Sequence, residues 1–188
     1  RGYALRYREW YGKKILSDGT QNVGLKMVAE EVGNGIRERT NEKIKMYVAD
    51  PAAFKEDGGP SHVERMGLPF IRADNSRVAK AGHVGGWDQM RSRMIGTRER
   101  DDNGLLGDGW PMIGCFNTCA DSIRTIPALQ HDNHNPEDID TNMEDHAADE
   151  WRYFCMARPY ATRQKTAQVI HTDIWGRRKQ AVNSWKVL

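Results

Sequence analysis

The chain has 188 residues, of which 38% are hydrophobic and 29% are charged. This length and composition suit one globular domain with a proper core, and they exclude a chain of low complexity. Because the formal net charge is only +2, any binding to nucleic acid has to come from local basic patches and not from the overall field.

The first half of the chain alternates between strand and helix patterns. Apolar residues at every second position predict a strand over residues 2–11, and apolar residues at helical spacing predict a helix over 23–39, which two internal glycines weaken. A second strand is predicted over 43–49. Ser61, with a glutamate three residues later, predicts the capped start of a short helix, and another strand is predicted over 68–73.

The second half continues this alternation. Residues 75–100 are basic and contain a predicted helix around Trp87, and residues 111–116 predict a short apolar strand. Thr118 is expected to cap the next helix. A polar, acidic loop over 130–141 then leads into a further helix. Such alternation with short connections predicts an α/β domain with a mostly parallel sheet and helices on its faces.

That last helix carries an unusual concentration of charge. On a 3.6-residue period, Asp145, His146 and Asp149 share one side. Like charges one turn apart repel each other, so a bound cation would explain the pattern, and oxygen ligands with one imidazole suit Mg²⁺ or Mn²⁺ better than zinc. A solvated acidic face is the alternative. The opposite side is largely apolar, with Met143, Ala147, Trp151, Phe154 and Cys155.

Two other features are candidates for function. Asp50 follows the strand predicted over 43–49, and ligands collect at the carboxyl ends of strands in parallel sheets. A turn or capping role before Pro51 is the alternative. Basic side chains that suit non-specific phosphate contacts lie around the glycine-bearing segment, although a solvated helix face would also explain many of them. They are Arg72, Arg77, Lys80, Arg91, Arg93, Arg98 and Arg100.

The cysteines and the hydropathy bear on the cellular location. The three cysteines form no C-x-x-C pair, and their odd number argues against a disulfide framework. No apolar run approaches the roughly 18 residues that would cross a bilayer, and the opening residues show no secretory signal pattern. We therefore expect a protein of the reducing cytoplasm with no membrane contact.

Several short motifs occur in an order typical of one viral family. Together they resemble the C-terminal nuclease domain of bacteriophage or prophage terminase large subunits, the motors that package and cut viral DNA. The similarity covers roughly residues 3–158. The motifs are YVADPAAF at 47–54, ADNSR at 73–77, GWDQMR at 86–91, CFNTC at 115–119, IPALQHD at 126–132, EDIDT at 137–141 and EDHAADEWRY at 144–153.

The resemblance implies an RNase H-like mixed sheet flanked by helices. Residues 1–158 would form this nuclease domain without its first strands, which would lie upstream of Arg1, and residues 159–188 would form a basic tail. The chain contains no G-x-x-x-x-G-K-[ST] phosphate loop, so it carries no ATP motor of its own. Implied partners are double-stranded DNA, the terminase small subunit and the portal or procapsid, in the cytoplasm of the bacterial host.

The resemblance also implies an endonuclease that uses two Mg²⁺ or Mn²⁺ ions held at three acidic positions. Asp50 corresponds to the second position. Asp149 with His146 corresponds to the third, and Asp145 is the alternative there. The first acid has no counterpart in the chain, so we expect little cleavage by these residues alone. Other readings are a non-cutting module that binds DNA or a partner on the same scaffold, and a resolvase-type nuclease, which would usually dimerise.

Overall fold

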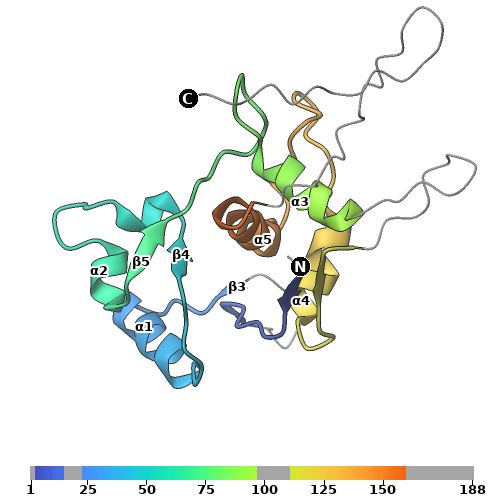
Figure 1. The fold of residues 1–188 in the computed structure, drawn as a ribbon. Coiled ribbons are helices and arrows are strands. Elements are labelled where there is room, and N and C mark those ends of the chain that lie inside the picture. Colours follow the sequence, from blue (N-terminus) through green and yellow to red (C-terminus); the bar gives the residue numbers. More distant parts are fainter. Residues whose placement is uncertain (1–2, 15–22, 97–110, 160–188) are drawn as a thin grey trace, which may run out of the picture.

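The computed structural model describes residues 3–14, 23–96 and 111–159, and Figure 1 shows their arrangement. The strands are β1 (Ala4–Arg6), β2 (Lys13–Lys14), β3 (Val23–Gly24), β4 (Tyr47–Ala49), β5 (Phe70–Arg72) and β6 (Ile113–Cys115). The α-helices are α1 (Ala29–Glu38), α2 (His62–Met66), α3 (Gly86–Ile95), α4 (Ala120–Thr125) and α5 (His146–Ala157), and 3-10 helices span Pro51–Phe54 and Ile126–Ala128. Nearly all of the predicted basic tail lies outside the described residues.

The strands form three separate pairs. β1 pairs with β6 and β4 pairs with β5, both in parallel, whereas β2 and β3 form a small antiparallel pair. The predicted mixture of helices with parallel strands is therefore confirmed. In the part of the chain that the structure describes, however, the pairs do not join into one continuous sheet.

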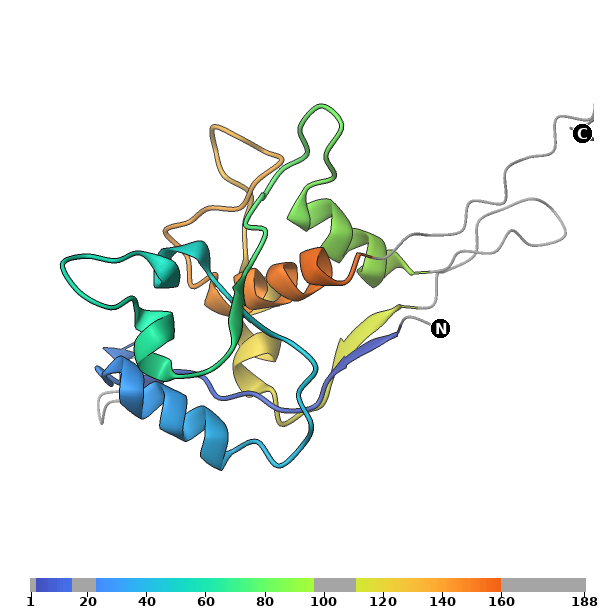
Figure 2. The ribbon, with the colours of Figure 1, turned by 60° about the vertical axis from the view of Figure 1, so that its left-hand side comes forward.

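Helix α5 lies between the two parallel pairs, with β4 and β5 on one side and β1 and β6 on the other (Figure 2). α3 packs along α5. The main core is made where these elements meet, and burying its large apolar side chains supplies the driving force for their association. The members of this core are Ala4, Trp87, Met90, Ile113, Ala148, Trp151 and Cys155.

The predicted elements form at their expected places but are shorter than the patterns suggested. The helix predicted over 23–39 begins only at Ala29, because residues 23–24 pair as β3 and Lys26 adopts a positive φ of 56°. The capping box predicted at Ser61 is confirmed, since its hydroxyl accepts from the Glu64 amide and the Glu64 carboxylate accepts from the Ser61 amide.

The prediction that Thr118 caps α4 was wrong. Cys119 occupies the N-cap position and makes no capping hydrogen bond through its side chain. Instead, the buried carboxylate of Glu9 accepts hydrogen bonds from the amides of Asp121 and Ser122, at 2.7 and 3.1 Å. A carboxylate at a helix start satisfies amides that lack partners and interacts favourably with the helix dipole. Glu9, which is distant in the sequence, thus caps α4 in place of Thr118.

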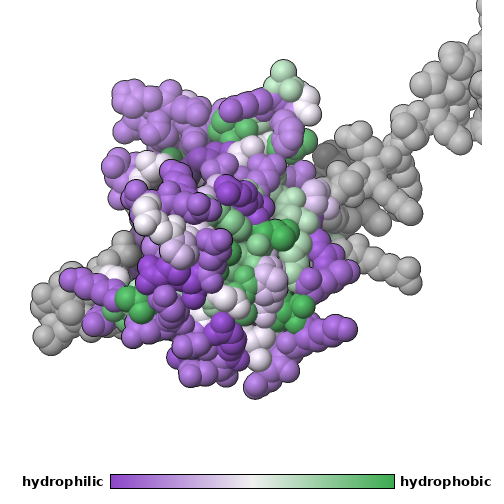
Figure 3. Space-filling view, turned by 90° about the vertical axis from the view of Figure 1, so that its left-hand side faces the viewer, coloured by the Kyte–Doolittle hydropathy of each residue, from purple (hydrophilic) through white to green (hydrophobic). Residues whose placement is uncertain are grey.

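The surface drawn in Figure 3 is mostly hydrophilic, with hydrophobic residues gathered in the middle of that face. Within residues 3–14, 23–96 and 111–159, no helix is both long and apolar enough to cross a membrane. All three cysteines are free thiols, and Cys119 and Cys155 are fully buried.

The glycine at position 33 allows α1 and α2 to pack closely. A Cβ at this position would overlap the carbonyl oxygen of Met66, which belongs to the backbone of α2 and cannot rotate away. We expect Gly33→Ala to lower the free energy of unfolding by about 1–3 kcal/mol, although alanine is the better helix former. Glu38→Ala, on the exposed end of the same helix, should change stability by less than about 0.5 kcal/mol. Urea denaturation of both variants measures this, and a Gly33→Ala protein as stable as the parent would contradict the packing.

Candidate acidic site on helix α5

Three polar side chains form a ridge along α5. Asp145, Asp149 and Tyr153 are spaced four residues apart, so they lie one above another on the same face of the helix. The hydroxyl of Tyr153 donates a hydrogen bond to Oδ2 of Asp50, which directly follows β4. The structure therefore places Asp50 in contact with Tyr153 of this ridge. That Asp50 and the aspartates of α5 share a metal ion stays a prediction.

Tyr153 stands between two carboxylates. Burial raises the pKa of its hydroxyl, and the hydrogen bond to Asp50 and the negative charges of Asp149 and Asp50 raise it further. The phenol consequently stays protonated at any physiological pH and acts as a donor. Asp50 also accepts from the amide of Ala52 at 2.6 Å, as the N-cap of the 3-10 helix that starts at Pro51. The capping role that was the alternative for Asp50 is thus present as well.

Arg77 is held at the centre of the acidic side chains. Its Nε donates to Asp138 at 2.8 Å, and its Nη1 lies 3.7 Å from Asp145 and 3.6 Å from Asp149. The guanidinium also stacks over the ring of Trp87, 5.2 Å from the centroid. The pKa of Asp138 is lowered although burial opposes the charge, because Arg77, the Ile139 amide and the Trp87 indole all donate to it.

Arg152 neutralises the same ridge from beneath. Its side chain is 1% exposed, and its Nε and Nη2 contact Oδ1 of Asp149 at 3.0 and 2.9 Å. The guanidinium lies over the ring of Tyr153 at 4.6 Å, and its Nη1 donates to the carbonyl of Ser76 at 3.3 Å. Arg77 also contacts Oδ1 of Asp149. The second carboxylate oxygen, Oδ2, accepts no hydrogen bond within the described ranges.

The other charged residues of segment 144–150 do not join this ridge. Glu144 accepts hydrogen bonds from Arg124 and Tyr11, and Glu150 pairs with Arg6. The side chain of His146, which was expected to share the face of the two aspartates, is 69% exposed, and its Nδ1 lies 3.9 Å from Asp145. Guanidinium groups thus provide cations beside these acids. Among the described residues, no group of three or more histidine, cysteine, aspartate or glutamate side chains is placed to hold a metal ion.

The basic residues predicted to contact DNA fall into three sets. Arg93 is only 4% exposed and donates to the carbonyl of Arg158, and Arg77 is tied to the acids. Neither presents a free guanidinium on the surface, because each is needed to satisfy buried acceptors of the fold. Exposed positions are Arg72, Lys80 and Arg91, whereas Arg98 and Arg100 lie outside the described residues.

Asp138 and Trp87 are parts of this site that the sequence reasoning did not single out. Asp138 connects Arg77, the Trp87 indole and the amide of Ile139. Its signal in the sequence was its place in the EDIDT motif, while Trp87 was named only as the centre of a predicted helix and in the GWDQMR motif. The site thus extends from α5 to the start of α3 and the acidic loop.

Comparison of the chain with known protein families, with characterised proteins and with solved structures finds no match.

Two neighbouring acids at the start of α5 should respond oppositely to neutralisation. Arg124 and the Tyr11 hydroxyl lower the pKa of Glu144 to about 2 against the opposing effect of burial. Burial and the charge of Asp149 raise the pKa of Asp145 above its usual value. We expect Glu144→Gln to lower the free energy of unfolding at pH 7 by about 1–3 kcal/mol. Asp145→Asn should leave it level or raise it slightly.

The pH dependence follows from the same shifts. The contribution of Glu144 is fully present above its usual pKa of 4.5 and is lost as the pH falls through about 2. The difference in the free energy of unfolding between the parent and Glu144→Gln should therefore become smaller in acid. The charged carboxylate of Asp145 lowers the free energy of unfolding, and this effect appears only as the pH rises above 3.8 through the raised pKa of the group. Urea denaturation between pH 3 and 7 measures the free energy of unfolding of both variants. If both are destabilised equally at pH 7, the opposite pKa shifts of Glu144 and Asp145 are wrong.

Proposed function

We propose that the protein is the nuclease domain of a DNA-packaging terminase, a divalent-metal-dependent endonuclease in which Asp50 and Asp149 contribute carboxylates to one metal site. The observation that carries the proposal is the contact of Tyr153 with Asp50, which joins the end of β4 to the acidic ridge of α5. The motif order described above supports the same conclusion. Portal, procapsid and the terminase small subunit are the partners that this proposal implies.

The donor chemistry of these residues fits Mg²⁺ or Mn²⁺. Both ions prefer carboxylate oxygens, and Oδ2 of Asp149 accepts no hydrogen bond among the described residues. A pair of such ions about 3.5–4 Å apart would activate a water and offset the charge on the leaving 3′ oxygen of the phosphodiester. Because the described residues contain no group of three ligand side chains, Asp50 and Asp149 make only part of a site, and we infer weak binding by this chain.

The residues of the ridge have tasks that do not depend on the ion. Tyr153 orients Asp50 by its hydrogen bond, and Arg152 fixes Oδ1 of Asp149 so that the other oxygen faces away from the guanidinium. Arg77 neutralises Asp145, which would otherwise repel Asp149 one turn later. On the nuclease proposal, Asp145 tunes the charge of the site, and His146 at its exposed rim is the proton shuttle.

A second candidate function is a module that binds DNA or a partner protein without cutting. The observation in its favour is that guanidinium groups already neutralise the acids, since Arg77 and Arg152 pair with the aspartates, Arg124 with Glu144 and Arg6 with Glu150. A cluster that is satisfied in this way has a structural purpose without any metal.

Manganese binding separates the two candidates. The electron paramagnetic resonance signal of free Mn²⁺ should fall as the 188-residue chain is added, and Asp50→Asn should weaken this binding by about tenfold or more. Asp50 is the better position to change because Asp149 also neutralises buried Arg152. Asp57→Asn, in an exposed loop, is the matched control. Nicking of supercoiled plasmid is followed in parallel. Equal binding by the parent and Asp50→Asn, or no binding at all, would exclude the metal site.

The exposed basic residues should give DNA binding that depends on salt. Substituting Arg72, Lys80 or Arg91 by alanine should weaken binding to any duplex sequence and reduce the slope of log K against log salt by about 1 each. Arg65→Ala is the control, because Glu30 holds this exposed arginine through two hydrogen bonds of 2.9 Å, whereas Arg91 has a single contact with Asp88 at 3.2 Å. Fluorescence anisotropy with two unrelated duplexes measures the slopes. If Arg65→Ala has the same effect as the three test variants, the contact surface is assigned wrongly.

A further inference from the structure

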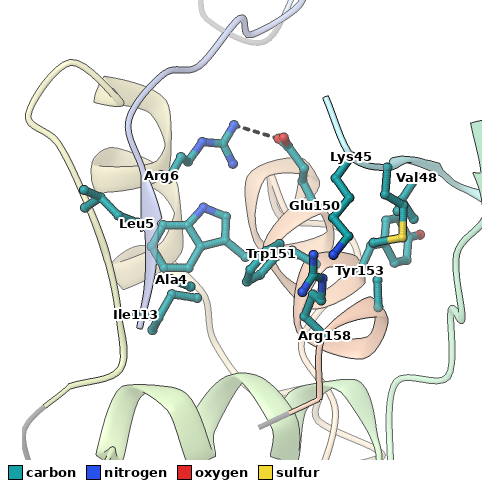
Figure 4. Close-up of a pocket in the computed structure, with 13 residues that line it drawn as sticks. Ala4, Leu5, Arg6, Lys45, Val48, Ile113, Glu150, Trp151, Tyr153 and Arg158 are labelled. Atoms are coloured by element: carbon teal, nitrogen blue, oxygen red, sulfur yellow. Dashed lines mark hydrogen bonds and ion pairs between the residues drawn. The ribbon is translucent and has the colours of Figure 1, made fainter. Parts of the chain in front are cut away.

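A cavity of about 370 Å³ separates the two parallel strand pairs. Figure 4 shows α5 behind it, with β1 on one side and β4 on the other. Much of its wall is apolar, with Ala4 from β1, Val48 from β4 and Phe154 from α5, whereas the side chain of Leu5 points away from α5 (Figure 4). Phe154 is 41% exposed, so apolar area is open to solvent here.

Both strands turn an unpaired backbone edge toward this cavity. In β1, the Ala4 amide donates to Met112 and the Arg6 carbonyl accepts from Phe116, each at 2.9 Å. Since alternate residues of a strand face opposite neighbours, the amide and carbonyl of Leu5 point away from β6. They have no backbone partner in the part of the chain that the structure describes.

β4 repeats this arrangement on the other side. The Ala49 carbonyl accepts from the Ala73 amide at 2.8 Å, so Tyr47 and Ala49 face β5 and Val48 faces away from it. Val48 also lines the cavity. Parallel sheets of only two strands are rarely stable alone, and an open apolar edge invites another strand to pair with it. In the described part of the chain, the cavity is therefore bounded by two strand edges that each lack a neighbouring strand.

Polar groups in the wall also lack partners. The indole Nε1 of Trp151 and the Nε of Arg6 are buried and make no hydrogen bond within the described residues, and both side chains line the cavity. A buried donor without an acceptor costs about 1–3 kcal/mol. Lys45 and Arg158 add positive charge and point into the cavity (Figure 4), and neither has an ion-pair partner among the described residues. An occupant with negative charge would pair with Lys45 and Arg158.

We propose that this cavity, bounded by β1, β4 and α5, docks an extended strand of another polypeptide chain. Its backbone would pair with the open edge at Leu5, its apolar side chains would face α5, and an acidic side chain would reach Lys45 and Arg158. This mode is strand addition, in which main-chain hydrogen bonds supply affinity and side-chain pockets supply selectivity. It does not depend on the nuclease proposal.

A small apolar anion would match the wall and the positive charges but not the strand edges. Only a polypeptide backbone offers donors and acceptors at the spacing that the edge of β1 presents. For this reason the open edges, more than the volume of the cavity, favour a peptide over a fatty acid or a similar ligand.

The probe is a labelled peptide of alternating valine and threonine with a glutamate at each end. Binding is followed by fluorescence anisotropy with the 188-residue chain. Leu5→Pro removes the open amide of β1 while leaving the bonds to β6 in place, because Leu5 makes none of them. We expect this variant to bind the peptide about tenfold more weakly, which corresponds to about 1.4 kcal/mol. Leu5→Val, which keeps the amide, should bind nearly as well as the parent.

A second set of measurements does not rely on the folding of a proline variant. A peptide of the same sequence with N-methyl groups on alternate residues cannot pair along one edge, and it should bind the parent chain at least about tenfold more weakly. Lys45→Glu should weaken binding of the glutamate-ended peptide and strengthen binding of a lysine-ended one. Equal affinity for the methylated peptide, displacement of the peptide by decanoate at equal concentration, or a chain dimer that the peptide does not dissociate would each overturn the proposal.

Discussion

The buried guanidinium of Arg152 is the constraint on which the rest of the described structure depends. A charge that is 1% exposed has to be neutralised, since its desolvation costs several kcal/mol and losing one partner of a buried pair costs about 3–5 kcal/mol. Asp149 supplies the carboxylate and Ser76 supplies a carbonyl acceptor. The stem of Arg152 packs where Gly86 has no side chain. One side chain thus ties α5 to the loop before α3 and to the start of α3 itself.

This constraint places two demands on Asp149. The fold needs its Oδ1 to neutralise Arg152 and Arg77, and the proposed nuclease site needs its other oxygen. The two demands are compatible because both arginines approach the same oxygen atom. A carboxylate that is held on one side is also pre-oriented, which reduces the entropy lost when a ligand binds to the other side. The same carboxylate can therefore serve both the fold and the proposed site.

Tyr153 connects the acidic ridge to the cavity between the strand pairs. Its hydroxyl bonds to Asp50, and its ring forms part of the cavity wall. A strand seated in the cavity would consequently lie beside the residues proposed to hold metal. α5 contributes to both, since Asp149 lies on its acidic ridge and Trp151 and Phe154 lie in the cavity wall.

The sequence by itself determined the order of α1 to α5 with β1, β4, β5 and β6, but not β2 and β3. It also determined the capping box at Ser61 and the placement of Asp145 and Asp149 on one face of α5. These features follow from local periodicity and from hydrogen bonds between near neighbours. Only the tertiary structure decided which cations neutralise those acids. Arg77 had been predicted to contact DNA, yet it lies among Asp138, Asp145 and Asp149. Ion pairs between residues far apart in the chain depend on how the elements pack, so local sequence patterns do not predict them.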